Sequence, residues 1–382
     1  MDKMFRRTEE SKLTSWFFEI DRKLLWMVLL MIVIGMFFAV SAGSVAAERI
    51  HMPWYFFLVK ALPFYGVGLV TLFVASLLST KNVLRLSVLN VCVGLMLLAV
   101  TVVAPHIIKG SARFVSIGPF NVMPSDIMKP GFIILTAWFL AAMRKRFGEK
   151  MFLNREAWKF RWLSWWSYLA VFLPTLAIIF LHPDFGTSML YLGVLGVMLF
   201  IAGLPWSIIL MMIGGAIGLF FVAYSTMSHV QNRVNTLLTG SGDNYQVTQS
   251  IQSIQHGGLL GRGDDAFIKQ SLPDAHTDFI FAAIVEDLGA LLACALLALL
   301  LYVINLLIRD AWHARDEFVF YAVGGTAALF GIQICINLIS TLRLFAPKCM
   351  TLPFISYGGS SLIAFCLLFG MVLAIVREDK WK

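Results

Sequence analysis

The chain has 382 residues, of which 59% are hydrophobic and only 14% charged, and its formal net charge is +8. Soluble domains carry nearer to about 25% charged residues, and apolar stretches of roughly 20 residues, enough for a helix to cross a bilayer, recur along this sequence. The composition excludes a soluble protein and predicts an all-α polytopic membrane protein. Basic residues lie between the apolar stretches, which argues against nucleic-acid binding. The five cysteines are scattered, with neither a disulfide framework nor a metal-binding spacing.

Ten membrane spans are predicted within one integral membrane domain, residues 1–382. Their approximate bounds are 24–46, 56–79, 83–103, 127–143, 167–180, 187–202, 206–224, 278–307, 317–340 and 360–376. The N-terminal tail, 1–23, is polar and differs from a cleavable signal peptide. A large outer loop, 225–277, separates the seventh span from the eighth, and a short tail, 377–382, follows the tenth.

The distribution of Lys and Arg predicts the orientation of these spans. Most of the 30 basic residues fall on one side of the membrane if both termini lie on that side. Because basic loops stay in the cytoplasm, both termini are predicted to be cytoplasmic. The basic cluster 144–161, interleaved with several Trp residues, predicts an amphipathic segment on anionic lipid. The unusual polar segments then gather on the outer side. Since a transporter would spread polar groups towards the midplane, this favours chemistry at the outer membrane face.

The fourth span begins with Pro124, Ser125 and Asp126, followed by Lys129. Pro and Ser start a helix, and Asp suits its positive end. Lys129 lies one turn inside an apolar helix, where it must snorkel, pair with an acid or bind an anion. The alternative to a functional role is an i,i+3 ion pair with Asp126.

Two outer segments follow in chain order. Residues 183–187 (PDFGT) make a tight turn between spans five and six, in which Asp184 is expected to cap the next helix. The large outer loop contains 257–263 (GGLLGRG), where Gly permits sharp turns and close backbone approach, and where Arg262 is a candidate phosphate or sugar contact. The Gln-rich stretch before it, 245–253, predicts either one face of a helix at the site or an amphipathic helix lying on the membrane.

The eighth span starts in the stretch 272–289, which is polar at first and apolar within a few residues. Asp278 stands at its outer mouth beside His276, and Glu286 and Asp287 lie within the apolar run. Acids are costly in lipid, so these are expected to face a cavity or a partner inside the protein. The alternative is that the polar residues at the mouth only cap the helix.

The tenth span is preceded by 352–361 (LPFISYGGSS), which breaks the helix and then exposes hydroxyls and backbone donors at a helix start. Such a start is a competent anion site. The alternative is a re-entrant connector that is tolerated because protein buries it.

Four of these motifs, in this order, resemble the SEDS family, the polytopic peptidoglycan glycosyltransferases that comprise FtsW, RodA and SpoVE. They are 183–187, 257–263, 275–281 (AHTDFIF) and 352–361, and the resemblance covers nearly the whole chain. Residues 245–250 (YQVTQS) and the Ala275 before His276 resemble the FtsW division branch, whereas RodA members more often carry a basic residue before that His.

The sequence departs from the family pattern in loops beside the implied site. An unusual rate or partner dependence is therefore expected. The departures are Met123 and Asp126 for Gln and Glu, Phe114 for Trp, His182 for Gln, Asp264 and Asp265 in a stretch usually spaced by Gly, and Ala346 and Cys349 around Lys348.

The resemblance implies polymerisation of lipid II, an undecaprenyl-diphosphate-linked disaccharide-pentapeptide, into glycan strands outside the cytoplasmic membrane. Asp278 is then the expected general base, and His276 is the competing base or orients Asp278. Glu286, Asp184 and Asp126 are expected to be structural or gating acids. The expected substrate contacts are Lys129, Arg113, Arg262, Arg343, Lys348, His276, Ser356 and Ser360. A divalent cation, Mg²⁺ or Mn²⁺, would assist the diphosphate, but no ligand set in the sequence demands one.

The same resemblance implies a class B penicillin-binding protein as transpeptidase partner, other division membrane proteins, and a place in the bacterial inner membrane at the septum. Three alternatives remain open from the sequence. An elongation-type polymerase would do the same chemistry, a lipid II flippase would need no base at Asp278, and a scaffold would tolerate changes in the outer polar residues.

Overall fold

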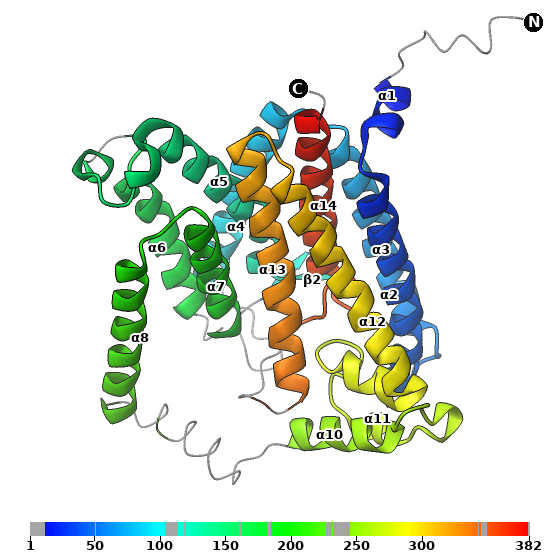
Figure 1. Ribbon diagram of the computed structural model, residues 1–382. Helices are drawn as coiled ribbons and strands as arrows, with labels where there is room; N and C mark the ends of the chain where they lie inside the picture. The colour runs from blue at the N-terminus through cyan, green and yellow to red at the C-terminus, as the bar shows by residue number, and fades with distance from the viewer. Residues whose placement is uncertain are drawn as a thin grey trace, which may run out of the picture.

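The computed structural model describes residues 12–49, 51–103, 114–117, 120–159, 162–181, 185–226, 231, 245–342, 344 and 350–380. Each of the ten predicted spans coincides with a helix in these ranges (Figure 1). The helices are α2 (Arg22–Arg49), α3 (Phe56–Ser76), α4 (Thr80–Val103), α5 (Pro124–Phe147), α6 (Trp165–Leu181), α7 (Phe185–Ile201), α8 (Trp206–Thr226), α12 (Ile280–Trp312), α13 (Glu317–Thr341) and α14 (Gly359–Lys380).

Seven helices of the described chain, namely α2 to α5 and α12 to α14, are long and apolar enough to cross a membrane. Helices α6 and α7 are apolar but have 17 residues each. The all-α, multi-pass architecture is therefore confirmed, whereas the number of ten crossings stays a prediction.

The connecting segments contain shorter elements. These are α1 (Lys12–Glu19), β1 (Val115–Ile117), β2 (Phe120–Val122), η1 (Gly148–Lys150), η2 (Arg155–Trp158), α10 (Tyr245–Gly257), η3 (Gly263–Asp265) and α11 (Ile268–Ser271). Strands β1 and β2 pair antiparallel in a small hairpin that the sequence analysis did not predict. The basic segment 144–161 ends α5 and continues as two short 3₁₀ turns, and its contact with anionic lipid stays a prediction.

Helix α14 forms the centre of the bundle, packed against α3, α5 and α13 (Figure 1). The rings of Phe365 and Phe369 lie within 6 Å of Phe330 on α13 and of Phe354 in the segment before α14. This aromatic cluster fixes the segment 350–358, which carries one of the family motifs, onto the bundle axis.

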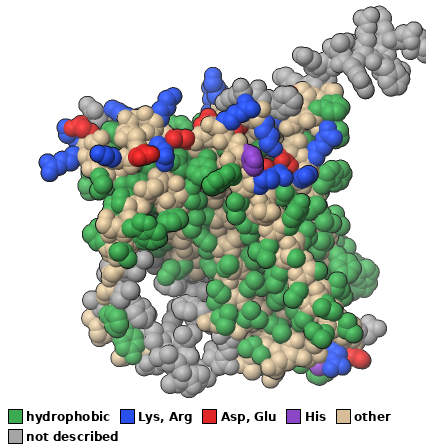
Figure 2. Space-filling model, viewed as in Figure 1, with side chains coloured by type: hydrophobic (Ala, Val, Ile, Leu, Met, Phe, Trp, Pro, Cys, Tyr) green, Lys and Arg blue, Asp and Glu red, His purple; other side chains and the backbone are tan. Residues whose placement is uncertain are grey.

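Charged side chains gather at one end of the molecule, where α1 and the end of α14 lie, and a mostly uncharged belt follows below it (Figure 2). Asp21 there accepts from Lys380 at 2.8 Å and from Arg309 at 3.2 Å. Burial alone would raise the pKa of Asp21, but these cations and the Leu24 backbone N–H hold that pKa below its usual value. Two surface cavities, of about 410 and 740 Å³, also lie at this end. The charged end of the molecule lies opposite to the start of α12 (Figure 1).

Candidate functional site

Asp278 lies in a turn that ends just before α12. The turn is built on Asp274, which has φ 52° and whose carbonyl oxygen accepts from the N–H groups of Thr277 at 3.0 Å and Asp278 at 3.1 Å. The N-cap position of α12 is occupied by Phe279, whose side chain makes no capping hydrogen bond. Asp278 therefore does not occupy the N-cap position of α12. The helix begins two residues later than predicted.

Two distant segments hold the Asp278 turn in place. Asn337, on α13, donates its Nδ2 to the carbonyl oxygen of Asp278 at 2.8 Å and to that of Met350 at 2.6 Å. The Tyr357 backbone N–H donates to the carbonyl oxygen of His276 at 2.9 Å. The motifs 275–281 and 352–361 thus lie side by side, although about 75 residues separate them.

His276 is the centre of a small aromatic group at this place. Its ring centroid lies 4.6 Å from that of Phe57, at the start of α3, and 5.6 Å from that of Tyr357. Burial raises the pKa of the Tyr357 phenol. This packing orients the imidazole next to the turn that carries Asp278.

Of the two predicted serines, only Ser360 reaches another functional side chain. The Ser356 hydroxyl accepts from the Leu352 N–H at 2.8 Å and is buried, so it closes the local turn before α14. Ser360 donates to Oδ2 of Asp126 at 3.1 Å. Ser356 thus acts within its own segment in this structure, while Ser360 joins α14 to α5.

Lys129 is buried at the centre of a polar network. Its Nζ donates to Oδ1 of Asp126 at 2.7 Å and to Oε1 of Gln333, on α13, at 3.0 Å. The Gln333 amide in turn donates to the Thr351 carbonyl oxygen at 2.9 Å. The i,i+3 pair suggested by the sequence is present, and it is part of a chain that joins α5, α13 and the segment before α14. An ammonium has three donors, so one N–H of Lys129 remains for a further acceptor.

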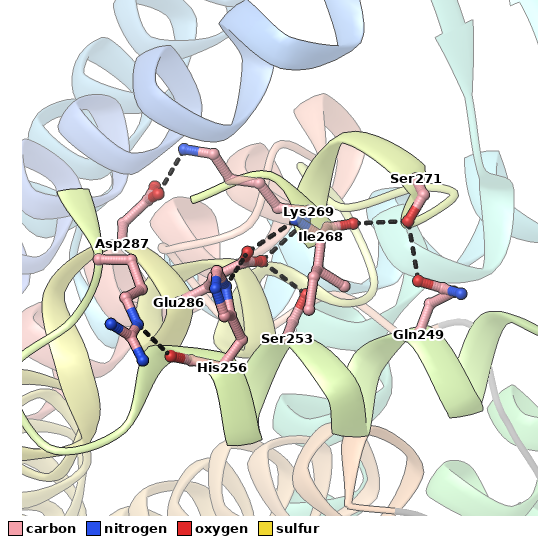
Figure 3. Close-up of polar contacts among 9 residues, drawn as sticks. Gln249, Ser253, His256, Ile268, Lys269, Ser271, Glu286 and Asp287 are labelled. Atoms are coloured by element: carbon pink, nitrogen blue, oxygen red, sulfur yellow. Dashed lines mark hydrogen bonds and ion pairs between the residues drawn. The ribbon is translucent and has the colours of Figure 1, made fainter. Parts of the chain in front are cut away.

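Glu286 is fully buried and fastens the outer loop to α12 (Figure 3). One carboxylate oxygen accepts from the Ile268 N–H at 2.8 Å and the other from the Lys269 N–H at 2.7 Å. The same carboxylate bonds the Ser253 hydroxyl at 2.7 Å and Nδ1 of His256 at 3.0 Å, both on α10. Glu286 is therefore a structural acid that holds α10 and α11 against α12.

Its neighbour Asp287 ties the same loop to the first span. It forms an ion pair with Lys269 and accepts from the Ser41 hydroxyl, on α2, at 3.0 Å. Both acids that the sequence places in an apolar run are thus turned into the protein and paired, as expected of acids at membrane depth.

Arg262 is exposed, and its Nε donates to the His256 carbonyl oxygen at 2.8 Å. Its backbone N–H donates to the Glu286 carbonyl oxygen at 2.8 Å. The backbone of Arg262 therefore holds the loop, while the rest of its guanidinium is exposed.

Four of the predicted residues lie outside the described part of the chain: Arg113, Asp184, Arg343 and Lys348. Within the described ranges, no group of three His, Cys, Asp or Glu side chains is arranged to hold a metal ion.

Sequence reasoning missed Gln333 and Asn337, although a signal existed. They are amides four residues apart in an apolar helix, and therefore lie on one helix face. It also missed His256, whose partner Glu286 lies 30 residues further along the chain.

Known proteins resemble this chain along almost its whole length. Residues 22–381 match the cell cycle protein family FtsW/RodA/SpoVE. A Caulobacter vibrioides protein named probable peptidoglycan glycosyltransferase FtsW is 31% identical over 380 residues, covering 98% of this chain and 93% of that protein. Stage V sporulation protein E of Bacillus subtilis is 28% identical, covering 95% of this chain and 98% of that protein.

Two solved structures share the fold. A chain from a structural study of how a peptidoglycan synthase complex coordinates polymerization and crosslinking superposes with a TM-score of 0.76 at 24% identity, covering 95% of this chain and 99% of that chain. RodA of Thermus thermophilus superposes with a TM-score of 0.66 at 24% identity, covering 94% of this chain and 97% of that chain.

Proposed function

The chain belongs to the FtsW/RodA/SpoVE family of cell cycle proteins, and we propose that it is a peptidoglycan glycosyltransferase of the division type. Its substrate is lipid II, which it polymerises into glycan strands at the outer face of the bacterial inner membrane, at the septum. The division assignment rests on the FtsW names of the relatives and on the YQVTQS and AHTDFIF motifs.

One observation carries the proposal: the turn with Asp278 is held against the segment 350–358 and α13 by backbone-directed hydrogen bonds. These bonds fix the backbone at Asp278. A rigidly held acid at the end of a membrane span is what a general base needs, because proton transfer requires the base within hydrogen-bond reach of the substrate hydroxyl.

The proposed reaction uses this carboxylate at one step. Asp278 takes the proton of a sugar hydroxyl of one substrate as that oxygen bonds to the anomeric carbon of another. The bond from that carbon to the diphosphate oxygen breaks, and undecaprenyl diphosphate leaves with the electron pair. His276, packed between Phe57 and Tyr357, orients the turn beside Asp278. The leaving diphosphate needs cations, for which Lys129 and Arg262 are the proposed described contacts.

Lys129 has both a structural and a proposed catalytic role, and a double substitution separates them. Lys129→Met leaves the buried Asp126 carboxylate without its cation, which typically costs about 3–5 kcal/mol. Adding Asp126→Asn removes that uncompensated charge and is expected to restore thermal stability. If Lys129 also binds diphosphate, turnover of lipid II stays low in the double variant.

The measurements are the melting temperature and the initial rate of glycan formation for the single and double variants. Asp126→Asn alone is the matched control, because it removes the same carboxylate and keeps the lysine. Recovery of both stability and rate in the double variant would assign Lys129 to the fold alone.

The orientation is part of the proposal and has its own prediction. The charged end of the molecule is assigned to the cytoplasm, because basic segments are retained there. A reporter fused after Lys382 is expected to be active in its cytoplasmic form. Activity of an extracytoplasmic reporter at that position would contradict this orientation.

A membrane partner completes the proposed assembly. The relative solved as part of a peptidoglycan synthase complex supports a crosslinking partner for this chain. We propose a single-pass class B penicillin-binding protein, together with other division membrane proteins.

The test of the function is the product that the purified chain makes from lipid II. Glycan polymer, separated by gel electrophoresis, is expected in detergent micelles. Transfer of lipid II across a vesicle membrane without polymer would instead make the chain a flippase. Neither product, with normal recruitment of division proteins, would make it a scaffold.

A further inference from the structure

Helix α12 is broken at Gly289, and the glycine-rich loop 257–261 fills the break. Gly289 has φ 89° and ψ 165°, which are not helical. The N–H groups just after it donate outside the helix, Ala290 to the Gly258 carbonyl oxygen at 2.9 Å and Leu291 to that of Leu259 at 3.2 Å. The loop therefore supplies backbone partners that the helix has lost, as irregular backbone at membrane depth requires.

The loop and the helix meet without room for a side chain. A Cβ added at Gly289 would lie 2.3 Å from the Leu259 carbonyl oxygen, and one at Gly261 would lie 2.4 Å from the carbonyl oxygen of Asp287. Gly257 and Gly261 of this motif thus serve backbone packing against α12. The loop cannot move independently of the helix at this point.

Apolar side chains in this loop and just after it are largely exposed. Leu259 is 68% exposed, Leu260 81% and Phe267 62%. The residues of α12 that follow the break, Leu291 and Leu292, are also exposed. Because α12 is one of the membrane spans, its exposed apolar face is a lipid-facing face, and the loop extends that surface through its backbone bonds to Ala290 and Leu291.

The depth of the break follows from the length of α12. This helix has 33 residues, more than the roughly 20 that a hydrocarbon core requires. Its far end is marked by Arg309, which is paired with Asp21 and Asp310 in the charged end of the molecule. Counting about 20 residues back from Arg309 reaches Gly289. The residues before the break, from Ile280 to Glu286, are all buried in the protein.

We propose that Leu259, Leu260 and Phe267 form an apolar wedge that inserts among phospholipid acyl chains beside the break in α12. The leaflet is the one on the Asp278 side, which is the outer leaflet in the proposed orientation. Arg262 and Asp265, exposed between Leu260 and Phe267 in the chain, lie at its polar boundary. The wedge does not depend on the catalytic role of Asp278. It assigns Leu259 and Leu260 of the GGLLG segment to contact with lipid, and not with the substrate diphosphate.

Spin labels at single cysteines test this insertion in the full chain. The five native cysteines are replaced by Ala, and Leu260→Cys is labelled with a nitroxide in vesicles of phosphatidylcholine and phosphatidylglycerol. Leu291→Cys is the lipid-facing reference. Gln255→Cys is the water-facing control, since Gln255 is exposed on α10, away from its buried face. Collision rates with oxygen, which partitions into lipid, and with a water-soluble nickel chelate are compared.

The expected result is a ratio of oxygen to nickel collision rates at position 260 that matches position 291 and exceeds position 255. Leu259→Cys should behave in the same way, which protects the test against failure of one variant. A ratio at 260 equal to that at 255 would place the loop in water and overturn the proposal. A label shielded from both reagents would overturn it as well, because protein would then cover the loop.

Discussion

Replacing Glu286 by Leu is expected to release the outer loop from α12 and to destabilise the protein. The carboxylate is fully buried and accepts from two backbone N–H groups and one hydroxyl, and it bonds a histidine nitrogen. A buried polar group that loses its partner costs about 1–3 kcal/mol. Leu leaves the N–H groups of Ile268 and Lys269 without an acceptor, so the loss is expected to reach several kcal/mol.

Amide hydrogen exchange at Ile268 and Lys269 is the direct measurement, because both groups bond this carboxylate in the native state. Exchange is expected to become much faster in Glu286→Leu. The exchange rate in Glu286→Gln should lie between those of the wild type and Glu286→Leu. The Gln amide keeps one acceptor oxygen but brings an NH₂ group towards the backbone donors. Asp265→Asn is the matched control, because Asp265 is an exposed acid in the same loop. Wild-type exchange in Glu286→Leu would rule out this role.

The same substitution is also expected to affect the turn that carries Asp278. Glu286 closes the segment 268–286 into a ring, with α11 at one end and α12 at the other. Asp278 lies within that ring. Losing the Glu286 bonds that close this ring is therefore expected to lower the rate of glycan formation, although Asp278 itself is unchanged. Glu286 would then act by positioning Asp278 and not by contacting the substrate.

The sequence predicted the helices well because apolar length is a local property. Each predicted span has a helix at its place, and the acids Glu286 and Asp287 are turned inward as their cost in lipid requires. The break at Gly289 could not be predicted, because one glycine in an apolar run reads as continuous helix. Its cause is a backbone pairing with residues 258 and 259, about 30 positions away.

Single residues could be singled out from the sequence, but the contacts between them could not. Lys129 was singled out from its depth in an apolar helix, but its partner Gln333 is 204 positions away and no local pattern links them. The bond from the Leu352 N–H to the Ser356 hydroxyl, within the same turn, was not predicted, and the substrate contact of Ser356 stays a prediction. The glycines of 257–263 predicted sharp turns and close backbone approach to a ligand, and the structure shows that Gly257, Gly261 and Gly289 allow the loop and α12 to touch.

Asp278→Asn is expected to abolish nearly all glycan polymerisation. Asn keeps the size of the side chain and leaves the backbone bonds to Asn337 and Asp274 in place, so the turn should keep its shape. It removes the oxygen that takes the proton. Loss of a general base typically lowers the rate by about 10²–10⁴ fold. His276→Ala is the comparison, because His276 is the competing candidate for the base, whereas the proposed function gives it the role of orienting the turn.

The most direct measurement is the initial rate of glycan formation from lipid II by purified Asp278→Asn protein, with lipid II binding determined on the same sample. The expected result is binding like that of the wild type and a rate lower by about 10²–10⁴ fold, with a smaller loss for His276→Ala. Polymerisation by Asp278→Asn at a rate near that of the wild-type protein would contradict the assignment of Asp278 as the base.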